Sequence, residues 1–330
     1  MLLVINVLSL IILIGLIVLF AWLVKRAWGS KRAWLKWPGL VLSGLLTAAL
    51  VLVLGVALKG YYNVFFPVSR AVSDVKVEGT PAQIARGQQI ASICTGCHSP
   101  DGKLPLAGSK ENMAQVPGLG EIGKIYAPNL TPGGELASWS DGEILRAMRE
   151  GIHKSGRPLV IMPSQALHNL SDEDAYALVA FLRSQPAVKR DANWDAPANG
   201  VNLLGAVMLT AFGVSNSVQE PITAPVVAPP RGTSAEYGEY LTRSLGCRDC
   251  HGEKLTGGAG GFGPAAPNLT VVVPKWSEAD VVRVFREGKL PDGSAVNTMP
   301  WKEYTGALSD DDLKAIYNYL HGLTPEQLSK

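Results

Sequence analysis

The sequence predicts a mainly α-helical protein in which an N-terminal transmembrane helical hairpin is followed by two tandem copies of one small domain. Three observations predict this architecture: two long uncharged runs near the start, four cysteines in two identical pentapeptide patterns, and a similar sequence after each pentapeptide. The chain has 330 residues, 47% of them apolar and 18% charged. It is therefore long enough for several domains and less charged than an average soluble protein.

Residues 1–66 are expected to form a membrane anchor. The chain carries no charge from Leu2 to Val24 or from Trp37 to Leu58, and either run can cross a hydrocarbon core of roughly 30 Å. The short loop between the runs holds five Lys and Arg residues and no acidic one, which favours a cytoplasmic loop. We therefore predict a two-pass protein of the cytoplasmic membrane, with the lipid bilayer as a partner and both termini on the outer, periplasmic side.

Signal-peptide cleavage is the alternative for this region. Met1–Asn6 lacks the basic stretch that precedes the apolar core of a signal peptide, so cleavage after the first run is disfavoured. The second run does have a basic lead-in, although no small-residue cleavage site follows it closely. Internal cleavage after the second run therefore stays open.

All four cysteines lie in two C-x-x-C-H stretches, a spacing typical of c-type haem attachment. Two thiols three residues apart can form thioethers with the two vinyl groups of one porphyrin, and the next histidine can bind its iron. We therefore predict two covalently bound haem c groups. The residues concerned are Cys94, Cys97 and His98 in the first stretch and Cys247, Cys250 and His251 in the second.

Similar sequences follow the two pentapeptides. In both copies the distance from a Trp-Ser pair to a Met-Pro pair is 23 residues. We therefore predict two homologous domains, residues 80–187 and 231–325, joined by a linker, residues 188–230, that contains a short apolar segment. The shared landmarks are Ala127–Thr131 and Ala266–Thr270, Trp139 and Trp276, Met162 and Met299, and Leu170–Asp172 and Leu308–Asp310.

Four serines are each followed three residues later by a carboxylate, the pattern of a capped helix start. They are Ser140, Ser171, Ser277 and Ser309. The last helix of each copy is expected over Ser171–Ser184 and Ser309–Gly322, where apolar residues recur near helical spacing. The Gly- and Pro-rich stretches Gly102–Gly134 and Gly252–Pro267 look too irregular for strands.

Each haem iron needs a second axial ligand. The candidates are Met162, His153 and His168 in the first copy and Met299 and His321 in the second. Only the two methionines occupy matching places, and each is followed by proline. We therefore predict that the metal ligands are His98 with Met162 and His251 with Met299.

Other uses of these residues explain the sequence less well. A zinc site would need the two cysteine pairs to come together, and disulfides would leave the identical pentapeptides unexplained. A dihaem peroxidase needs an iron with an open position, whereas both copies retain a methionine. A structural cytochrome would hold a complex together without redox turnover.

The part of the chain that follows the predicted anchor resembles the c-type cytochrome subunits of bacterial membrane-bound dehydrogenases for alcohols and gluconate. Its motifs are specific for the class I cytochrome c fold and cover residues 80–187 and 231–325. The resemblance implies proximal His98 and His251, distal Met162 and Met299, imidazole-orienting carbonyls of Pro128 and Pro267, and close helix crossings at Gly87 and Gly238, near Phe181 and Tyr319.

The layout departs from that family, whose subunits typically carry three haems and a carboxy-terminal anchor. Two haems behind an amino-terminal anchor are more similar to the dihaem cytochrome subunits of some haem-copper oxidases and quinol-oxidising complexes. The apolar segment Val201–Val214 is too short to span a bilayer. We expect it to be a core helix that joins the two domains or else a contact for a membrane partner.

The predicted function is the relay of single electrons, as a subunit of a respiratory or photosynthetic complex, and not an enzymatic activity of its own. The alternative is the electron-accepting cytochrome of a membrane dehydrogenase. The expected partners are integral-membrane redox subunits and a soluble or membrane electron donor or acceptor. The net charge of +2 argues against a nucleic-acid partner, because such binders rely on a strong positive field.

Overall fold

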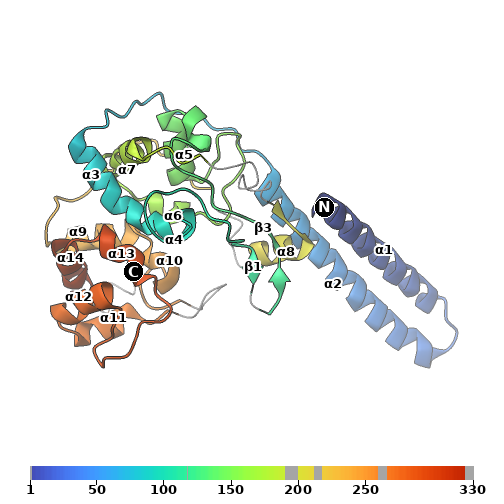
Figure 1. Ribbon diagram of the computed structural model, residues 1–330. Helices are drawn as coiled ribbons and strands as arrows, with labels where there is room; N and C mark the ends of the chain where they lie inside the picture. The colour runs from blue at the N-terminus through green and yellow to red at the C-terminus, as the bar shows by residue number, and fades with distance from the viewer. Residues whose placement is uncertain (1, 117, 190–199, 212–217, 259–265, 324–330) are drawn as a thin grey trace. The chain divides into compact units, whose positions relative to one another are not determined.

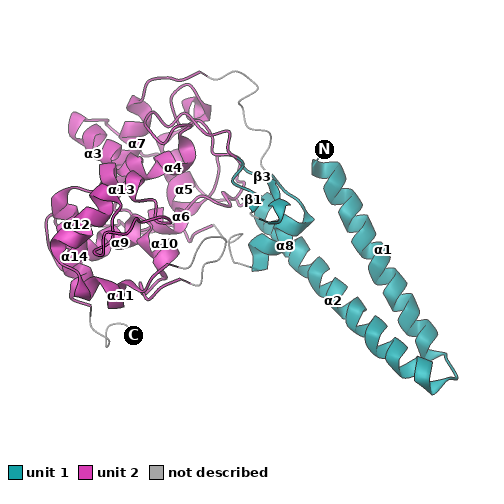
Figure 2. Cartoon of the chain, turned by 60° about the horizontal axis from the view of Figure 1, so that its bottom comes forward, with its two compact units in different colours: residues 1–67, 112–125, 197–216 teal, residues 68–111, 126–196, 217–330 magenta. Residues whose placement is uncertain are grey.

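The computed structural model describes residues 2–116, 118–189, 200–211, 218–258 and 266–323. It is 57% helix and 4% strand, which confirms the mainly α-helical class. The chain divides into two compact units (Figures 1 and 2). Unit 1 comprises residues 1–67, 112–125 and 197–216, and unit 2 comprises residues 68–111, 126–196 and 217–330.

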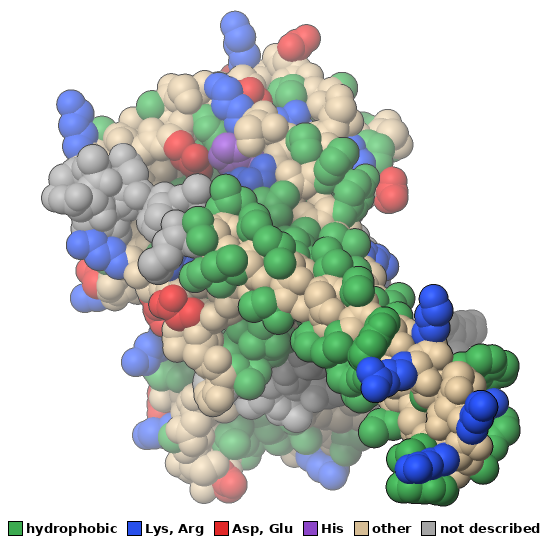
Figure 3. Space-filling model, turned by 90° about the vertical axis from the view of Figure 1, so that its right-hand side faces the viewer, with side chains coloured by type: hydrophobic (Ala, Val, Ile, Leu, Met, Phe, Trp, Pro, Cys, Tyr) green, Lys and Arg blue, Asp and Glu red, His purple; other side chains and the backbone are tan. Residues whose placement is uncertain are grey.

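Unit 1 is built around a hairpin of two long helices, α1 (Leu2–Trp28) and α2 (Ala33–Phe65). Both are long and apolar enough to cross a membrane. Most of their large side chains are exposed, including Leu3, Leu42 and Leu45, as expected for helices that lipid covers. Lys and Arg side chains gather at the turn of the hairpin (Figure 3).

Two short segments from later in the chain join the hairpin in unit 1. The antiparallel pairs are β1 (Gln115–Val116) with β2 (Gly120–Glu121) and β3 (Gly123–Lys124) with β4 (Gly200–Val201). The register places Gly123 opposite Val201 and Val116 opposite Gly120. The stretch Gly102–Gly134, expected to lack strands, therefore contains three, each only two residues long.

Helix α8 (Leu203–Ala211) packs closely on α2. A Cβ atom on Gly60 would lie 2.2 Å from the carbonyl oxygen of Ala206, so only glycine allows this approach. The expectation that the apolar segment is a core helix joining the two repeated domains is therefore wrong for its described part. An apolar helix without charges can bury one face against another apolar helix as readily as in a domain core. The residues of that segment after Ala211 lie outside the described ones.

Unit 2 holds both copies of the repeat. Repeat one begins with α3 (Pro81–Ala91), which Thr80 caps in a full capping box, followed by η1 (Ser92–Cys94) and α4 (Thr95–His98). Its later helices are η2 (Glu135–Ser138), α5 (Asp141–Glu150), α6 (Ser164–Leu167) and α7 (Asp172–Ser184). The two serine caps predicted here are confirmed, with the Ser140 and Ser171 side chains accepting the backbone N–H groups of Glu143 and Asp174.

Repeat two follows the same order. It contains α9 (Ala235–Ser244), α10 (Cys247–His251), α11 (Leu269–Val272), η3 (Val273–Lys275), α12 (Glu278–Glu287), α13 (Trp301–Ala307) and α14 (Asp310–His321). The predicted Ser277 and Ser309 caps are both present as capping boxes. The common order of elements supports the interpretation of an internal duplication.

In each repeat the first helix crosses the last one at a glycine. A Cβ atom on Gly87 would lie 1.9 Å from the Ala177 carbonyl oxygen, and one on Gly238 would lie 2.0 Å from that of Ala315. The first crossing also brings Gly87 beside Phe181, as expected. The second is centred at Ala315, about one turn before Tyr319.

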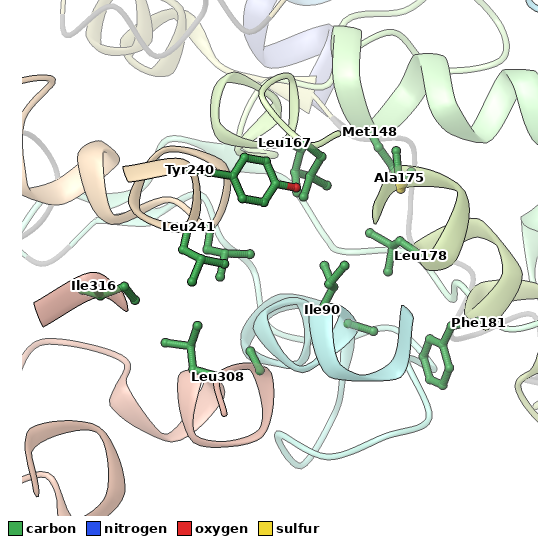
Figure 4. Close-up of a cluster of buried hydrophobic side chains, with 14 of the residues drawn as sticks. Ile90, Met148, Leu167, Ala175, Leu178, Phe181, Tyr240, Leu241, Leu308 and Ile316 are labelled. Atoms are coloured by element: carbon green, nitrogen blue, oxygen red, sulfur yellow. The ribbon is translucent and has the colours of Figure 1, made fainter. Parts of the chain in front are cut away.

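The two repeats share one hydrophobic core. Buried side chains of α3 and α7, such as Ile90 and Leu178, belong to the same cluster as Leu241 and Ile316 from α9 and α14 (Figure 4). Because side chains from both repeats fill this space, neither repeat encloses a core that is separate from the other.

A buried polar network crosses the same boundary, with the Asp174 carboxylate at its centre. Arg86 Nε and Nη2 donate to it at 2.8 Å each, and Tyr240 of repeat two donates through its hydroxyl at 2.7 Å. Arg231 adds a contact at 3.2 Å. Burial disfavours the charged form of Asp174, but the hydrogen bonds and positive charge of Arg86 outweigh burial and hold the pKa of this carboxyl below its usual range.

Candidate cofactor sites

The attachment residues of both repeats lie on short helical turns. Cys94 ends η1, and Cys97 and His98 lie in α4, whereas α10 contains the whole second pentapeptide. All four thiols are free, so no disulfide competes for them. One turn of helix places both thiols of a pentapeptide near the histidine that follows them, which suits a single macrocycle.

The histidine of each pentapeptide is oriented by a proline carbonyl. His98 Nδ1 lies 3.0 Å from the Pro128 carbonyl oxygen, and His251 Nδ1 lies 2.9 Å from that of Pro267. A carbonyl can only accept, so the N–H is on Nδ1 and the lone pair is on Nε2, the tautomer that binds iron. Burial lowers the pKa of both imidazoles, which favours their neutral form.

The proline carbonyls are held in place by the Asn-Leu-Thr turn that follows each proline. The Asn129 side-chain oxygen accepts from the Thr131 N–H at 2.9 Å, and Asn268 accepts from the Thr270 N–H at 3.0 Å. From the sequence, only the prolines of this repeated motif were given a role, and the Asn-Leu-Thr residues after them were not. Its repetition is the signal that could have identified the two asparagines as positioning residues.

A backbone contact also ties each histidine to the loop after it. The His98 carbonyl accepts the Gly108 N–H at 2.7 Å, and the His251 carbonyl accepts the Gly257 N–H at 2.9 Å. Both glycines have positive φ angles, 83° and 100°, which side chains rarely adopt. The loops differ in length between the repeats, yet they close onto the histidine in the same way.

The two methionines lie in matching turns. The Met162 carbonyl accepts the Ser164 N–H at 2.7 Å, and the Met299 carbonyl accepts the Trp301 N–H at 2.8 Å. Both side chains are half-buried and pack against the shared hydrophobic cluster. The identical turn supports equivalent roles, because it sets the same backbone direction at each methionine.

The remaining histidines are engaged elsewhere. Both ring nitrogens of His153 have polar neighbours, with Ser155 Oγ at 2.9 Å and Glu135 Oε2 at 3.3 Å. His168 Nδ1 lies 2.9 Å from the Arg149 carbonyl oxygen, and the exposed His321 ring stacks on Tyr317. None of these arrangements is repeated in the other copy.

The donor set fits haem better than a protein-ligated metal ion. Within the described residues no group of three or more His, Cys, Asp or Glu side chains could hold a metal, which leaves zinc without structural support. Each repeat instead offers two free thiols, a neutral imidazole oriented through Nδ1 and a half-buried thioether. When bound, haem supplies reversible one-electron chemistry between ferrous and ferric iron.

Family models match both repeats. Residues 84–186 match the model described as cytochrome c, and residues 233–320 match the one described as cytochrome c oxidase, cbb3-type, subunit III. Together with the two cradles around the cysteines and histidines, these matches define the class of protein. The chain is a dihaem cytochrome c with two covalent haem c groups.

Several curated proteins are similar to most of the chain. A nicotinate dehydrogenase subunit of Pseudomonas putida is 30% identical over 268 residues, which are 74% of this chain and 22% of that protein. The cytochrome c subunit of the quinone-dependent alcohol dehydrogenase of Gluconobacter oxydans is 28% identical over 288 residues, 73% of this chain and 55% of the relative. The gluconate 2-dehydrogenase cytochrome c subunit of Pantoea cypripedii is 28% identical over 288 residues, 77% and 62% of the two chains. The chain therefore spans less than two thirds of each of these relatives.

Proposed function

We propose that this dihaem cytochrome is the membrane-bound electron relay of a respiratory complex, with both haem domains on the periplasmic side. One observation carries the proposal. Both repeats have the same hydrogen bond from a pentapeptide histidine to a proline carbonyl, and the same chain also contains an apolar helical hairpin. The basic loop between α1 and α2 supports an orientation with that loop in the cytoplasm. The hairpin then keeps the relay beside an integral-membrane donor or acceptor.

The domain bounds stay those of the sequence repeat, residues 80–187 and 231–325. Within each domain we assign the cysteines to thioether attachment and the His98–Met162 and His251–Met299 pairs to axial ligation. Thioether ligation raises the reduction potential relative to two imidazoles. The role of the protein is to hold the ligands, exclude water and keep the two sites close, without bond chemistry of its own.

The axial assignment has a spectroscopic test. Oxidised protein with methionine ligation should show a weak absorption band at the red end of the visible spectrum, which arises from sulfur-to-iron charge transfer. Met162→His and Met299→His should each remove about half of that band, and the double variant should remove all of it. A wild-type protein without the band would contradict methionine ligation. The equivalent positions make each single variant the matched control of the other.

A second candidate, the electron-accepting subunit of a membrane dehydrogenase, is favoured by the names of the relatives. Several of the proteins similar to this chain are named as cytochrome subunits of alcohol, gluconate or fructose dehydrogenases. A dihaem peroxidase is less well supported, since both repeats present a methionine in the same turn. Rapid peroxide turnover by the purified protein would reverse that preference.

Purification of the full chain in mild detergent, with identification of the subunits that copurify, tests the partner. We expect an integral-membrane redox subunit of a respiratory complex. Recovery of a dehydrogenase catalytic subunit would establish the second candidate instead. Recovery of the cytochrome alone would contradict the subunit proposal.

The proposed orientation in the membrane has its own control. It is a variant in which five basic residues are all replaced by Gln, because it keeps the apolar spans and removes the charges that orient them. The residues are Lys25, Arg26, Lys31, Arg32 and Lys36.

A further inference from the structure

The helix that follows Met299 in repeat two lies against the haem-attachment segment of repeat one. Helix α13 contacts η1, and a Cβ atom on Gly306 would lie 2.7 Å from Ser92 Oγ. One turn earlier on α13, Glu303 Oε1 lies 3.1 Å from the position that a Cβ atom on Gly96 would occupy. Gly96 stands between the two attachment cysteines of repeat one. A carboxylate of repeat two therefore borders the first haem site.

The two repeats differ at the positions that make this contact. Counted from the first cysteine of each pentapeptide, Gly96 corresponds to Asp249, and counted from the methionines, Glu303 corresponds to Ala166. Repeat two therefore has a carboxylate inside its own attachment stretch. Repeat one has a glycine there, and the carboxylate comes from the other repeat. On the opposite side of the boundary, the Ala166 Cβ lies 3.8 Å from the position that a Cβ atom on Gly246 would occupy, and it carries no charge.

Among the described residues, the Glu303 carboxylate takes part in no salt bridge, and its Oε2 atom is buried without a hydrogen-bond partner. The adjacent Tyr304 does not donate to it, because its hydroxyl donates to the Leu245 carbonyl at 2.8 Å. A carboxylate in this setting acts over several ångströms, since the protein around it screens charge less than water does.

We propose that Glu303 is a redox-tuning residue that repeat two supplies to the first haem site. Its negative charge stabilises the ferric over the ferrous state of the haem attached at Cys94 and Cys97, and so lowers the reduction potential of that haem. The proposal rests on the dihaem electron-relay function. It gives the first site a carboxylate beside its attachment stretch, as Asp249 gives the second site one within its own.

Redox titration of the full chain in detergent, followed by haem absorbance, tests the proposal. Wild-type protein should give two one-electron midpoints. In Glu303→Gln, which removes the charge and keeps the shape, one midpoint should rise by about 59 mV, equivalent to a roughly tenfold change in the redox equilibrium. The other midpoint should move less. Glu303→Lys should raise the same midpoint further.

A rescue variant assigns the shifted midpoint to the first site. Gly96→Asp in the Glu303→Gln background gives repeat one the internal carboxylate that repeat two has at Asp249. It should lower the shifted midpoint again. Glu287→Gln, which removes an exposed carboxylate from repeat two, is the matched control and should leave both midpoints in place.

Three results would overturn the proposal: unchanged midpoints in Glu303→Gln, an equal rise of both, or a rise that Gly96→Asp does not reverse. None of these results would affect the electron-relay function, because two reversible midpoints would still be present. Absence of any haem midpoint in wild-type protein would instead overturn the function itself. Haem content and the absorption spectrum of each variant show whether both sites are still loaded.

Discussion

The two repeats hold the histidines of their pentapeptides alike, with imidazole-to-carbonyl distances of 3.0 Å in repeat one and 2.9 Å in repeat two, but they differ in where their charges lie. Repeat one has the buried Arg86–Asp174 ion pair. The corresponding residues of repeat two, counted from the crossing glycine and the serine cap, are Tyr237 and Asp312. Both copies have therefore kept the hydrogen bond between histidine and proline carbonyl, while the charged residues at the boundary between the copies differ.

This difference shows which parts of the repeat tolerate change. The segments around cysteine, histidine and methionine follow the same hydrogen-bond pattern in both copies. The helix faces at the boundary instead meet a different surface in each copy. There repeat one supplies the Arg86–Asp174 ion pair, and repeat two supplies Tyr240, whose hydroxyl donates a hydrogen bond to Asp174.

The largest effect is expected from breaking the ion pair of repeat one. Asp174→Asn should lower the free energy of unfolding by about 3–5 kcal/mol, because it leaves the buried Arg86 guanidinium without its counter-charge. Asp312→Asn, the matched change in repeat two, should cost only about 1 kcal/mol, since Asp312 supports a helix start. Denaturant unfolding of the haem-loaded protein, followed by tryptophan fluorescence, measures both. Equal losses would contradict the asymmetry.

A smaller effect, of similar size in both repeats, is expected at the helix crossings. Gly87→Ala and Gly238→Ala should each cost about 1–3 kcal/mol, because the new methyl group would overlap a backbone carbonyl oxygen that cannot move without separating the helices. Gly15→Ala in α1, where a Cβ atom would meet nothing within 4 Å, is the control and should be neutral in the same unfolding experiment. A cost at only one crossing would show that the repeats do not share this packing.

The smallest effect at ordinary pH is the acid dependence of Asp174. Its pKa in the folded protein lies below the usual carboxyl value of 3.8, so the stabilisation it provides is complete above that value. The stabilisation is lost as the pH falls through the lowered pKa, when the native carboxylate takes up a proton. Unfolding midpoints measured from pH 6 downward should therefore stay apart for wild type and Asp174→Asn down to the usual carboxyl value of 3.8, and converge only as the pH falls through the lowered pKa of Asp174. Parallel curves over the whole range would contradict a charged Asp174 in the native state.

Much of the fold and the site could be predicted from local patterns. The four serine caps and the last helix of each repeat depend on residues within a few positions of one another, and the structure has them where the sequence indicates. The resemblance correctly indicated the Pro128 and Pro267 carbonyls and the crossing glycines. The short strands near Gln115 and Gly123 were missed, because two-residue strands leave no alternation to detect.

The apolar segment that contains α8 was misjudged for a related reason. Its composition indicates that apolar surface must cover it, but composition does not indicate which part of the protein provides that surface. In the structure, Gly60 and Ala206 allow α8 to lie against α2, and composition gives no sign of that pairing. Glu303 likewise shows no repeat or motif, since the corresponding residue in repeat one is Ala166.

By itself, the sequence determined that this chain has two apolar helices, two haem-attachment stretches and a duplicated set of cysteine, histidine and methionine residues, because covalent attachment, capping and hydropathy act through neighbouring residues. The tertiary structure alone decided that the copies share one core, that Asp174 is the centre of the boundary and that Glu303 meets Gly96. Those contacts join residues far apart in the chain. They depend on which helix faces pack together, and many different sequences could satisfy the same local rules while packing differently.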